Sequence, residues 1–204
     1  LEGAEGPPAD PETGIGRWSF SAFQRAMREG ISHDGRHLYP AFPYTAFTRL
    51  GDDDLTALYA YLISLPPVVQ ATPEADLRAP FHLRPLMAGW NALHLQAGPR
   101  TVPAATLAAL PTGVDAALWQ RGEFLVNGPG HCGACHTPRD ALGAERGGSA
   151  YLSGAWVEGW HAPSLTALNR RTLPWSEQTI FGYLKHGHSP THGVAVWPMA
   201  QVVG

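Results

Sequence analysis

The sequence predicts an all-α protein in which short helices are joined by long, turn-rich loops. Apolar residues recur at helical spacing in several segments, and glycine or proline ends most of these segments. Of the 204 residues, 23 are glycine and 19 are proline, which is above the average usage of about 7% and about 5%. The apolar share of 44% and the seven tryptophans argue against disorder. We therefore expect a rigid globule rich in aromatic residues.

Two helices are predicted in the first 70 residues. The first begins after Ser19, which can cap its N-terminus, and ends at Gly30. The second covers residues 52–65 and has three aspartates in its first turn, where the helix dipole favours carboxylates. Its apolar residues at positions i, i+3, i+4 and i+7 are Leu55, Leu58, Tyr59 and Leu62. Two prolines at 66 and 67 stop this helix.

Three further helices are predicted, around residues 86–95, 115–126 and 176–187. In the first of them, Leu86, Trp90 and Leu93 are expected to be buried, together with Phe81 just before it. The last helix is expected to be capped by Ser176 and to end at a glycine.

The segment around the helix 19–30 recurs 157 residues later in the chain. The matching residues are Trp18-Ser19 with Trp175-Ser176, Phe23 with Ile180, Met27 with Leu184, Arg28 with Lys185, and Gly30 with Gly187. At the same offset Phe42 corresponds to Met199. The repeat predicts two copies of one structural module.

The repeat and the composition divide the chain into three stretches. Residues 1–70 are expected to form the C-terminal part of the first module, and residues 71–113, rich in Pro and Ala, a packed connector. Residues 114–204 are expected to form most of the second module, without a helix that corresponds to 52–65.

The charge and hydropathy of the chain exclude two classes of partner. The chain has 14 basic and 17 acidic residues, a formal net charge of −3, and therefore no polycationic field for a nucleic acid. No apolar stretch approaches the roughly 20 residues that cross a bilayer. Membrane association is therefore expected only through other segments or partners.

Both cysteines of the chain lie in one short motif, Cys132-Gly133-Ala134-Cys135-His136. This pattern is typical of covalent attachment of a c-type haem. Cysteines three residues apart on one helical turn can each form a thioether with a vinyl group of the porphyrin. The adjacent histidine then points at the iron as its proximal ligand. The motif predicts one haem c held by Cys132, Cys135 and His136.

Two other interpretations of the cysteines have less support. A thiol-redox pair would lie near a strand–helix–strand pattern, which the surrounding sequence does not have. A zinc site would need a second pair of ligands at short spacing, and His161 alone does not supply one.

Met199 is the candidate ligand on the other face of the iron, held in the turn Trp197-Pro198-Met199. A thioether opposite histidine gives a six-coordinate haem of raised potential, which suits electron transfer. The alternative is a methionine that fills a gap in the core, as expected for Met27 and Met87. In that case His188 or His192 would be the ligand, or the sixth position would be labile, as in a haem peroxidase or a ligand-binding haem protein.

The first module has Phe42 where the second has Met199. If the first module holds a haem, His33 or His37 is a candidate for its sixth ligand.

Several segments together resemble a known family. They are residues 121–126 (Arg-Gly-Glu-Phe-Leu-Val), 130–139 (Gly-His-Cys-Gly-Ala-Cys-His-Thr-Pro-Arg), 38–44 (Leu-Tyr-Pro-Ala-Phe-Pro-Tyr), 55–62 and 83–91. They resemble the multihaem cytochrome c subunits of membrane-bound bacterial dehydrogenases. Those subunits serve alcohol, gluconate and aldehyde dehydrogenases and the related nicotinate and isoquinoline oxidoreductases.

The resemblance implies class I cytochrome c-like domains, covalent haem c, and a location on the periplasmic side of the cytoplasmic membrane. It implies an electron-transfer subunit without catalysis of its own, between a dehydrogenase catalytic subunit and a quinone or a terminal oxidase. By position, Cys132 and Cys135 would bind haem, with His136 proximal and Met199 distal. Family members carry three haem sites, whereas this chain has one attachment motif, and Phe42 departs from the methionine that many relatives have there.

Overall fold

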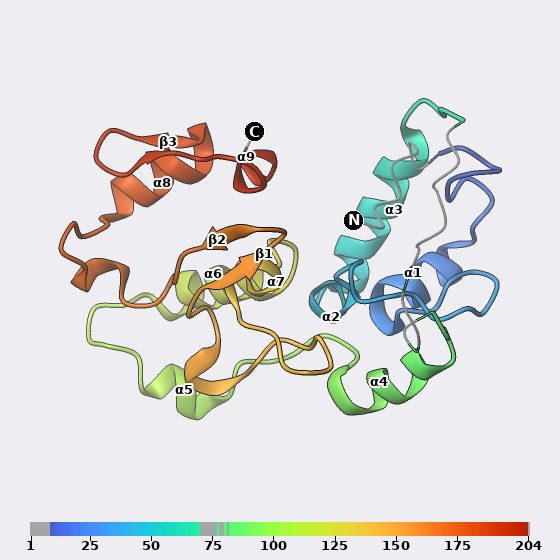
Figure 1. Cartoon of the computed structure of the whole chain (residues 1–204), viewed down its shortest axis with the longest axis horizontal. Helices are drawn as coiled ribbons and strands as arrows, with labels where there is room; N and C mark the ends of the chain where they lie inside the picture. Colours follow the sequence, from blue (N-terminus) through green and yellow to red (C-terminus); the bar gives the residue numbers. More distant parts are fainter. Residues whose placement is uncertain (1–8, 70–76, 78–79, 81, 204) are drawn as a thin grey trace. The chain divides into compact units, whose positions relative to one another are not determined.

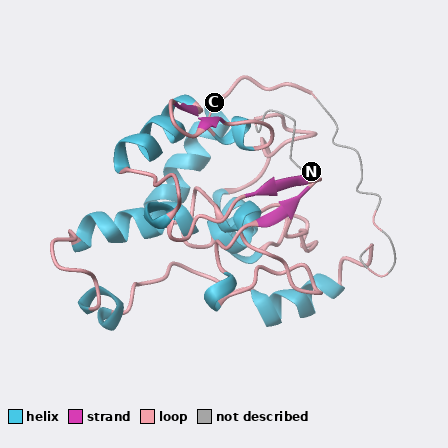
Figure 2. Ribbon diagram, turned by 60° about the vertical axis from the view of Figure 1, so that its left-hand side comes forward, coloured by secondary structure: helices cyan, strands magenta, loops and turns pink. Residues whose placement is uncertain are grey.

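The computed structural model describes residues 9–69, 77, 80 and 82–203 (Figure 1). Phe81, for which burial was expected, and most of residues 70–79 lie outside the described residues. The described chain consists of helices with few, very short strands (Figure 2). The predicted all-α class is therefore confirmed.

The chain divides into two compact units. The first comprises Leu1–Ala134 and Arg139–Glu145, and the second comprises Cys135–Pro138 and Arg146–Gly204. This division by contacts places residues 114–134 with the first unit, whereas the sequence groups them with the second module. The division into modules stays a prediction.

The first unit is helical. Its helices are α1 (Phe20–Glu29), α2 (Tyr44–Phe47), α3 (Asp52–Ser64), α4 (Leu86–His94), α5 (Ala104–Ala108) and α6 (Ala116–Asn127). The predicted long helices α1, α3, α4 and α6 are confirmed to within two residues at each end. The short α2 and α5 were not predicted.

Two apolar clusters hold the first unit together. In one, Phe23 and Met27 of α1 pack against Leu50 and Leu55, the last of which is fully buried. In the other, Tyr44 packs with Met87, Trp90 and Ala144. Phe42 contacts both clusters, so this side chain joins the two halves of the core.

The expectation for α4 was wrong in part. Trp90 is buried, but Leu86 and Leu93 are exposed. Met87 and Trp90 are three residues apart and share the buried face, whereas Leu86 and Leu93, seven apart, lie together on another face. The indole Nε1 of Trp90 donates a hydrogen bond to the carbonyl oxygen of Leu142 at 2.9 Å.

The second unit combines two small hairpins with short helices. Its elements are η1 (Gly148–Ala150), β1 (Ala155–Val157), β2 (Trp160–Ala162), η2 (Leu168–Arg170), α8 (Glu177–His186), β3 (His188–Ser189), β4 (Gly193–Val194) and α9 (Met199–Val202). Strands β1 and β2 pair antiparallel, and so do β3 and β4. The predicted helix α8 is confirmed, with a capping box at Ser176.

The 157-residue repeat is confirmed in the backbone. Helices α1 and α8 are both capped by serine side chains, and both end at a left-handed glycine, Gly30 or Gly187. An antiparallel pairing follows in each copy, Ile31 with His37 and His188 with Val194. The glycine carbonyl then accepts a hydrogen bond eight residues on in each copy, at 2.7 Å.

In the described part of the chain, none of the helices is both long and apolar enough to cross a bilayer.

Candidate functional site

Four of the five residues of the Cys-x-x-Cys-His motif form a single helical turn, α7 (Gly133–His136), and Cys132 directly precedes it. The N–H groups of Gly130 and Cys132 donate hydrogen bonds to the carbonyls of Leu125 and Val126, at 2.8 and 3.1 Å. The end of α6 therefore fixes the start of the motif. A Cβ atom on Gly130 would lie 2.6 Å from the Leu125 oxygen, so this close approach requires glycine.

The imidazole of His136 is buried and oriented by one backbone carbonyl. Its Nδ1 lies 2.7 Å from the carbonyl oxygen of Pro163, and only 9% of the residue is exposed. Because a carbonyl oxygen can only accept, Nδ1 carries the proton in this contact. In the neutral imidazole Nε2 is then the nitrogen without a proton, the form in which histidine binds a metal.

The backbone that follows His136 is also fixed. The N–H of Gly154 donates to the His136 carbonyl at 2.8 Å. The fully buried Thr137 accepts a hydrogen bond at its Oγ1 from the N–H of Leu152, at 3.0 Å. These contacts tie the motif to the segment that leads into β1 and β2.

Arg139 contacts the backbone of the motif. Its Nη2 donates to the carbonyl of Ala134 at 2.7 Å, and its Nη1 lies 3.8 Å from Oε1 of Glu145. Burial raises the pKa of Glu145, and the positive charge of Arg139 opposes that shift. This guanidinium therefore braces the turn between the two cysteines.

Neither cysteine forms a disulfide, although the two are three residues apart in the chain. Both side chains are partly accessible, as thiols that react with a porphyrin must be. In the described residues no group of three or more His, Cys, Asp or Glu side chains is placed to hold a metal ion.

Met199 is the first residue of α9 and is half-buried. Two residues before it lies Trp197, whose ring packs edge-on against that of Trp160, with ring centroids 6.2 Å apart. Met199 and His136 belong to the same unit, and their pairing across an iron stays a prediction.

The two histidines proposed as alternatives to Met199 have other contacts. His192 stacks on Trp175 with ring centroids 3.7 Å apart, and its Nδ1 lies 2.8 Å from the Oγ1 of Thr191. His188 is exposed, and its Nδ1 lies 3.1 Å from the carbonyl of His186. Both histidines stay alternatives to Met199 as the distal ligand.

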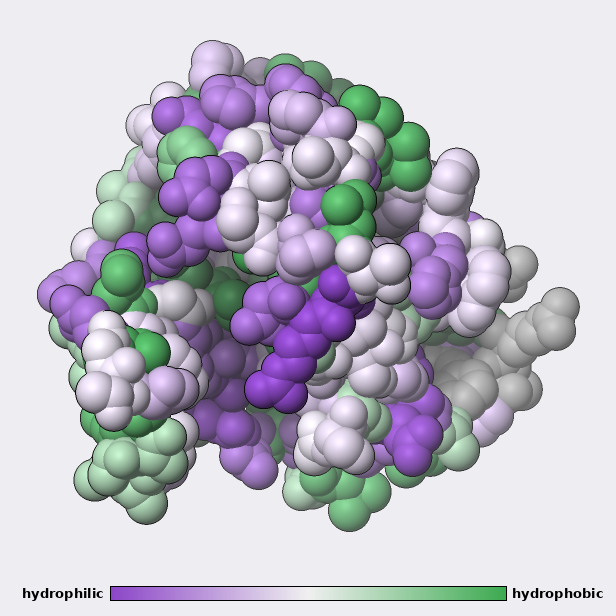
Figure 3. Space-filling view, turned by 90° about the vertical axis from the view of Figure 1, so that its left-hand side faces the viewer, coloured by the Kyte–Doolittle hydropathy of each residue, from purple (hydrophilic) through white to green (hydrophobic). Residues whose placement is uncertain are grey.

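The apolar side chains of the second unit are suited to covering a flat apolar group. Among the described residues of this unit, no apolar side chain is buried, whereas the first unit has a buried apolar core. Figure 3 shows apolar residues at several places on the surface of one face of the molecule. The large exposed ones in this unit are Trp156, Trp160, Leu173, Phe181, Leu184, Val194, Val196, Trp197 and Val202. Such residues commonly line a haem, and with the orientation of His136 they fit a haem at this motif.

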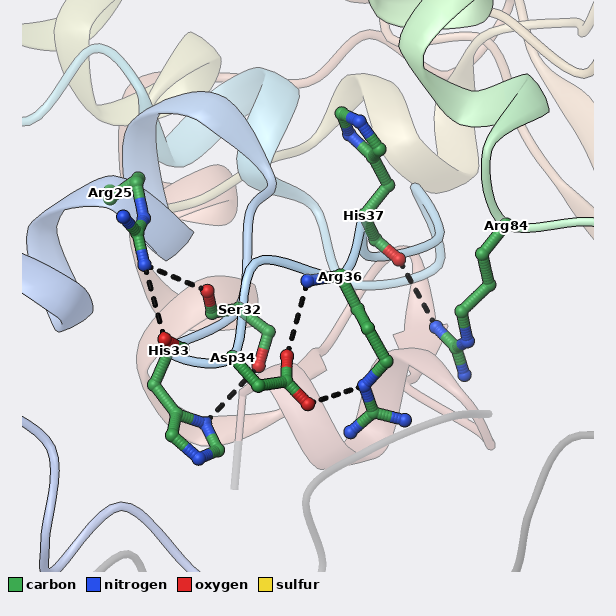
Figure 4. Close-up of polar contacts among 7 residues, drawn as sticks. All are labelled: Arg25, Ser32, His33, Asp34, Arg36, His37 and Arg84. Carbon is green, nitrogen blue, oxygen red and sulfur yellow. Dashed lines mark hydrogen bonds and ion pairs between the residues drawn. The ribbon is translucent and has the colours of Figure 1, made fainter.

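In the first copy of the repeat, the two candidate histidines point to opposite sides of the turn (Figure 4). His33 packs against Trp18, with ring centroids 4.8 Å apart. The Nδ1 of His37 is buried without a hydrogen-bond partner among the described residues. Arg25 and Arg84 hold the backbone of this turn through carbonyls, including that of His37 at 3.2 Å. At most one of the two imidazoles can therefore face a given haem.

Sequence reasoning missed Pro163 and Gly154. Pro163 acts through its backbone carbonyl oxygen, a group that every residue type has, and it lies 27 residues from His136. Neither its residue type nor its spacing therefore points to this contact.

Taken together, fold and motif define a helical protein of the cytochrome c class. No family model matches the chain. Over 95% of its length it is 58% identical to a subunit of the nicotinate dehydrogenase of Pseudomonas putida, covering 16% of that protein. It is 41% identical to the cytochrome c subunit of the quinone alcohol dehydrogenase of Gluconobacter oxydans, over 95% of the chain and 40% of the relative. It is 36% identical to a diheme cytochrome c-type protein of Cereibacter sphaeroides, over 95% of the chain and 62% of the relative.

The chain is thus homologous to cytochrome subunits of dehydrogenases, and the resemblance identified from its motifs is confirmed. The names of these relatives support an electron-transfer role, as predicted, and imply haem c as the cofactor. The chain spans less than two thirds of the length of each of these relatives.

Proposed function

We propose that the chain carries electrons through a haem c bound covalently at Cys132 and Cys135, within the cytochrome subunit of a dehydrogenase. The observation that carries the proposal is the hydrogen bond between Nδ1 of His136 and the Pro163 carbonyl. It fixes the ring and leaves Nε2 available for an iron.

The residues of the chain have separate tasks in this proposal. A bound haem would supply an iron that changes between Fe(II) and Fe(III) without proton transfer. Cys132 and Cys135 would anchor the porphyrin edge, His136 would be the proximal ligand, and Met199 the distal ligand. The Pro163 carbonyl would strengthen His136 as a ligand to the iron, and the sulfur of Met199 would raise the potential.

The repeat also supports a division of the chain into two modules. We propose residues 1–70 as the C-terminal part of one cytochrome c-like domain, 71–113 as a connector, and 114–204 as a second domain that holds the attachment motif. The matching caps and pairings around α1 and α8 support a haem-binding role for the first module as well.

The partner and place of action are also proposed. A dehydrogenase catalytic subunit would supply electrons, and a quinone or a terminal oxidase would accept them, on the periplasmic side of the bacterial cytoplasmic membrane. The names of the relatives support the dehydrogenase partner, since they are subunits of nicotinate and alcohol dehydrogenases.

The absorption spectrum of the purified protein, oxidised and then reduced, tests the proposal. We expect the sharp α and β bands of low-spin haem c, and a methionine–iron charge-transfer band in the oxidised form. A five-coordinate, high-spin spectrum would favour a peroxidase or a ligand-binding haem protein. A chain without haem would contradict both.

A further inference from the structure

We infer that Thr137 sets the reduction potential of the haem at Cys132 and Cys135, by holding in place the carbonyl group that orients His136. This inference deepens the proposed function and rests on it, because it requires a haem with His136 as the proximal ligand. Thr137 acts through the backbone of other residues and not as a ligand, so it is a positioning residue.

The hydroxyl of Thr137 fixes the backbone of Leu152. Thr137 follows His136 directly and is fully buried. Its Oγ1 accepts a hydrogen bond from the N–H of Leu152, 15 positions further along the chain, at 3.0 Å. A buried N–H group that loses its acceptor costs free energy. The hydroxyl therefore stabilises the position of Leu152 beside the motif.

The backbone of Leu152 depends on this support. Its φ of 56° lies in the left-handed region, which a leucine rarely adopts and which persists only where the surroundings hold it. The carbonyl of Leu152 accepts two hydrogen bonds, from the N–H of Leu165 at 2.8 Å and from the Oγ of Ser164 at 3.3 Å. Leu152 thus links Thr137 on one side to the segment 164–165 on the other.

Three hydrogen bonds and the chain itself form a closed ring around the proximal histidine. From Thr137 the ring passes to Leu152 and then to Leu165. Leu165 lies two residues after Pro163, whose carbonyl lies 2.7 Å from Nδ1 of His136. The bond from His136 to Thr137 closes the ring, and all five residues belong to the same compact unit. A shift of Leu152 therefore moves the Pro163 carbonyl relative to the imidazole.

The strength of the contact between His136 and Pro163 affects the two oxidation states differently. A strong hydrogen bond from Nδ1 makes the imidazole a better electron donor to the iron, which stabilises Fe(III). The iron gains or loses one electron, and the proton stays on Nδ1 in both states. A longer and weaker contact therefore raises the reduction potential.

Redox titration of the haem-loaded protein tests the inference with two substitutions at one site. Thr137→Val keeps the shape of the side chain and removes the acceptor, whereas Thr137→Ser keeps the hydroxyl. We expect a potential above that of the parent protein in Thr137→Val and the parent potential in Thr137→Ser. In the NMR spectrum of the reduced protein, the Nδ1 proton of His136 should exchange with solvent several-fold faster in Thr137→Val.

Thr179→Val is the matched control, because the Oγ1 of Thr179 also accepts a backbone N–H. The donor is Ser176, at 2.8 Å, and the contact caps helix α8. We expect this variant to unfold at a lower denaturant concentration than the parent protein and to keep the parent potential. It therefore separates a loss of stability from a change at the proximal histidine.

Hydrogen exchange in the parent protein tests the ring without any substitution, should Thr137→Val not fold. The amide proton of Leu152 and the Nδ1 proton of His136 should be protected to a similar degree, because opening of the ring frees both. An unprotected Leu152 amide beside a protected Nδ1 proton would overturn the inference.

The titrations can also overturn it. An unchanged or lowered potential in Thr137→Val, or a rise of equal size in Thr137→Ser or Thr179→Val, would contradict the role of Thr137 and leave the proposed function intact. Absence of haem from the parent protein would instead contradict the proposed function itself.

Discussion

Gly154 packs directly on the backbone of Ser164. A Cβ atom at residue 154 would lie 2.8 Å from the Ser164 nitrogen and 3.0 Å from the Ala162 oxygen, and φ at Gly154 is +94°. The residue between these two contacts is Pro163, whose carbonyl orients His136. The glycine therefore sets the distance between the carbonyl and the imidazole.

Gly154→Ala should weaken the hydrogen bond to His136, because the 162–164 segment must move away. A proximal histidine that loses this acceptor is less basic and stabilises Fe(III) less, so we expect the reduction potential of the haem to rise. Potentiometric titration measures the change. Gly159→Ala is the control, since Gly159 has a similar φ of +82° with open space around its Cβ position.

Met199→Ala should abolish the methionine–iron charge-transfer band and lower the reduction potential, because a thioether ligand raises it. The near-infrared spectrum of the oxidised protein and a redox titration are the measurements. Met87→Ala serves as the control, since Met87 is buried in the core of the first unit. An unchanged band in Met199→Ala would rule out ligation by Met199.

The long helices could be predicted from the sequence because several local signals agree in each. Ser19 and Gly30 mark both ends of α1, and Ser176 and Gly187 do the same for α8. In α2, by contrast, only four residues are helical, fewer than the apolar period needs to become visible. The motif residues were likewise found locally, since Cys132, Cys135 and His136 lie within one turn.

The contacts around the motif could not be predicted, because they join distant residues. The ring of Phe47 meets His131 across 84 positions of the chain, and Arg49 reaches Glu123 across 74. Neither pair has a spacing or residue type that distinguishes it from ordinary core and surface residues.

Arg49→Met should lower the free energy of unfolding by about 1–2 kcal/mol, between the values typical of exposed and buried ion pairs. It leaves the half-buried Glu123 with the hydrogen bond from Asn127 but without its ion pair to Arg49. Denaturant unfolding followed by circular dichroism gives the difference. Arg17→Met, which breaks the exposed pair with Glu12, should change stability by less than about 0.5 kcal/mol. Equal effects of both variants would show that the Arg49–Glu123 ion pair stabilises the fold no more than an exposed ion pair does.

Tyr44 should make stability depend on alkaline pH. Burial raises its pKa to about 12, although the hydrogen bond to Asn91 acts in the other direction. The folded state therefore favours the neutral phenol, so its contribution is complete below pH 10 and is lost as pH rises from 10 through about 12. The difference in unfolding free energy between the parent and Tyr44→Phe should shrink over this range. A difference independent of pH would contradict the assignment.

The central claim is a haem bound covalently by two thioethers at Cys132 and Cys135. The most direct measurement is the reduced spectrum of the protein in alkaline pyridine, after expression with the machinery that attaches haem c. We predict the α band of a haem with two thioethers in the parent protein, and the shifted band of a single thioether in Cys132→Ala. A parent protein from which haem is extracted by acidified solvent, or one that carries none, would contradict the claim.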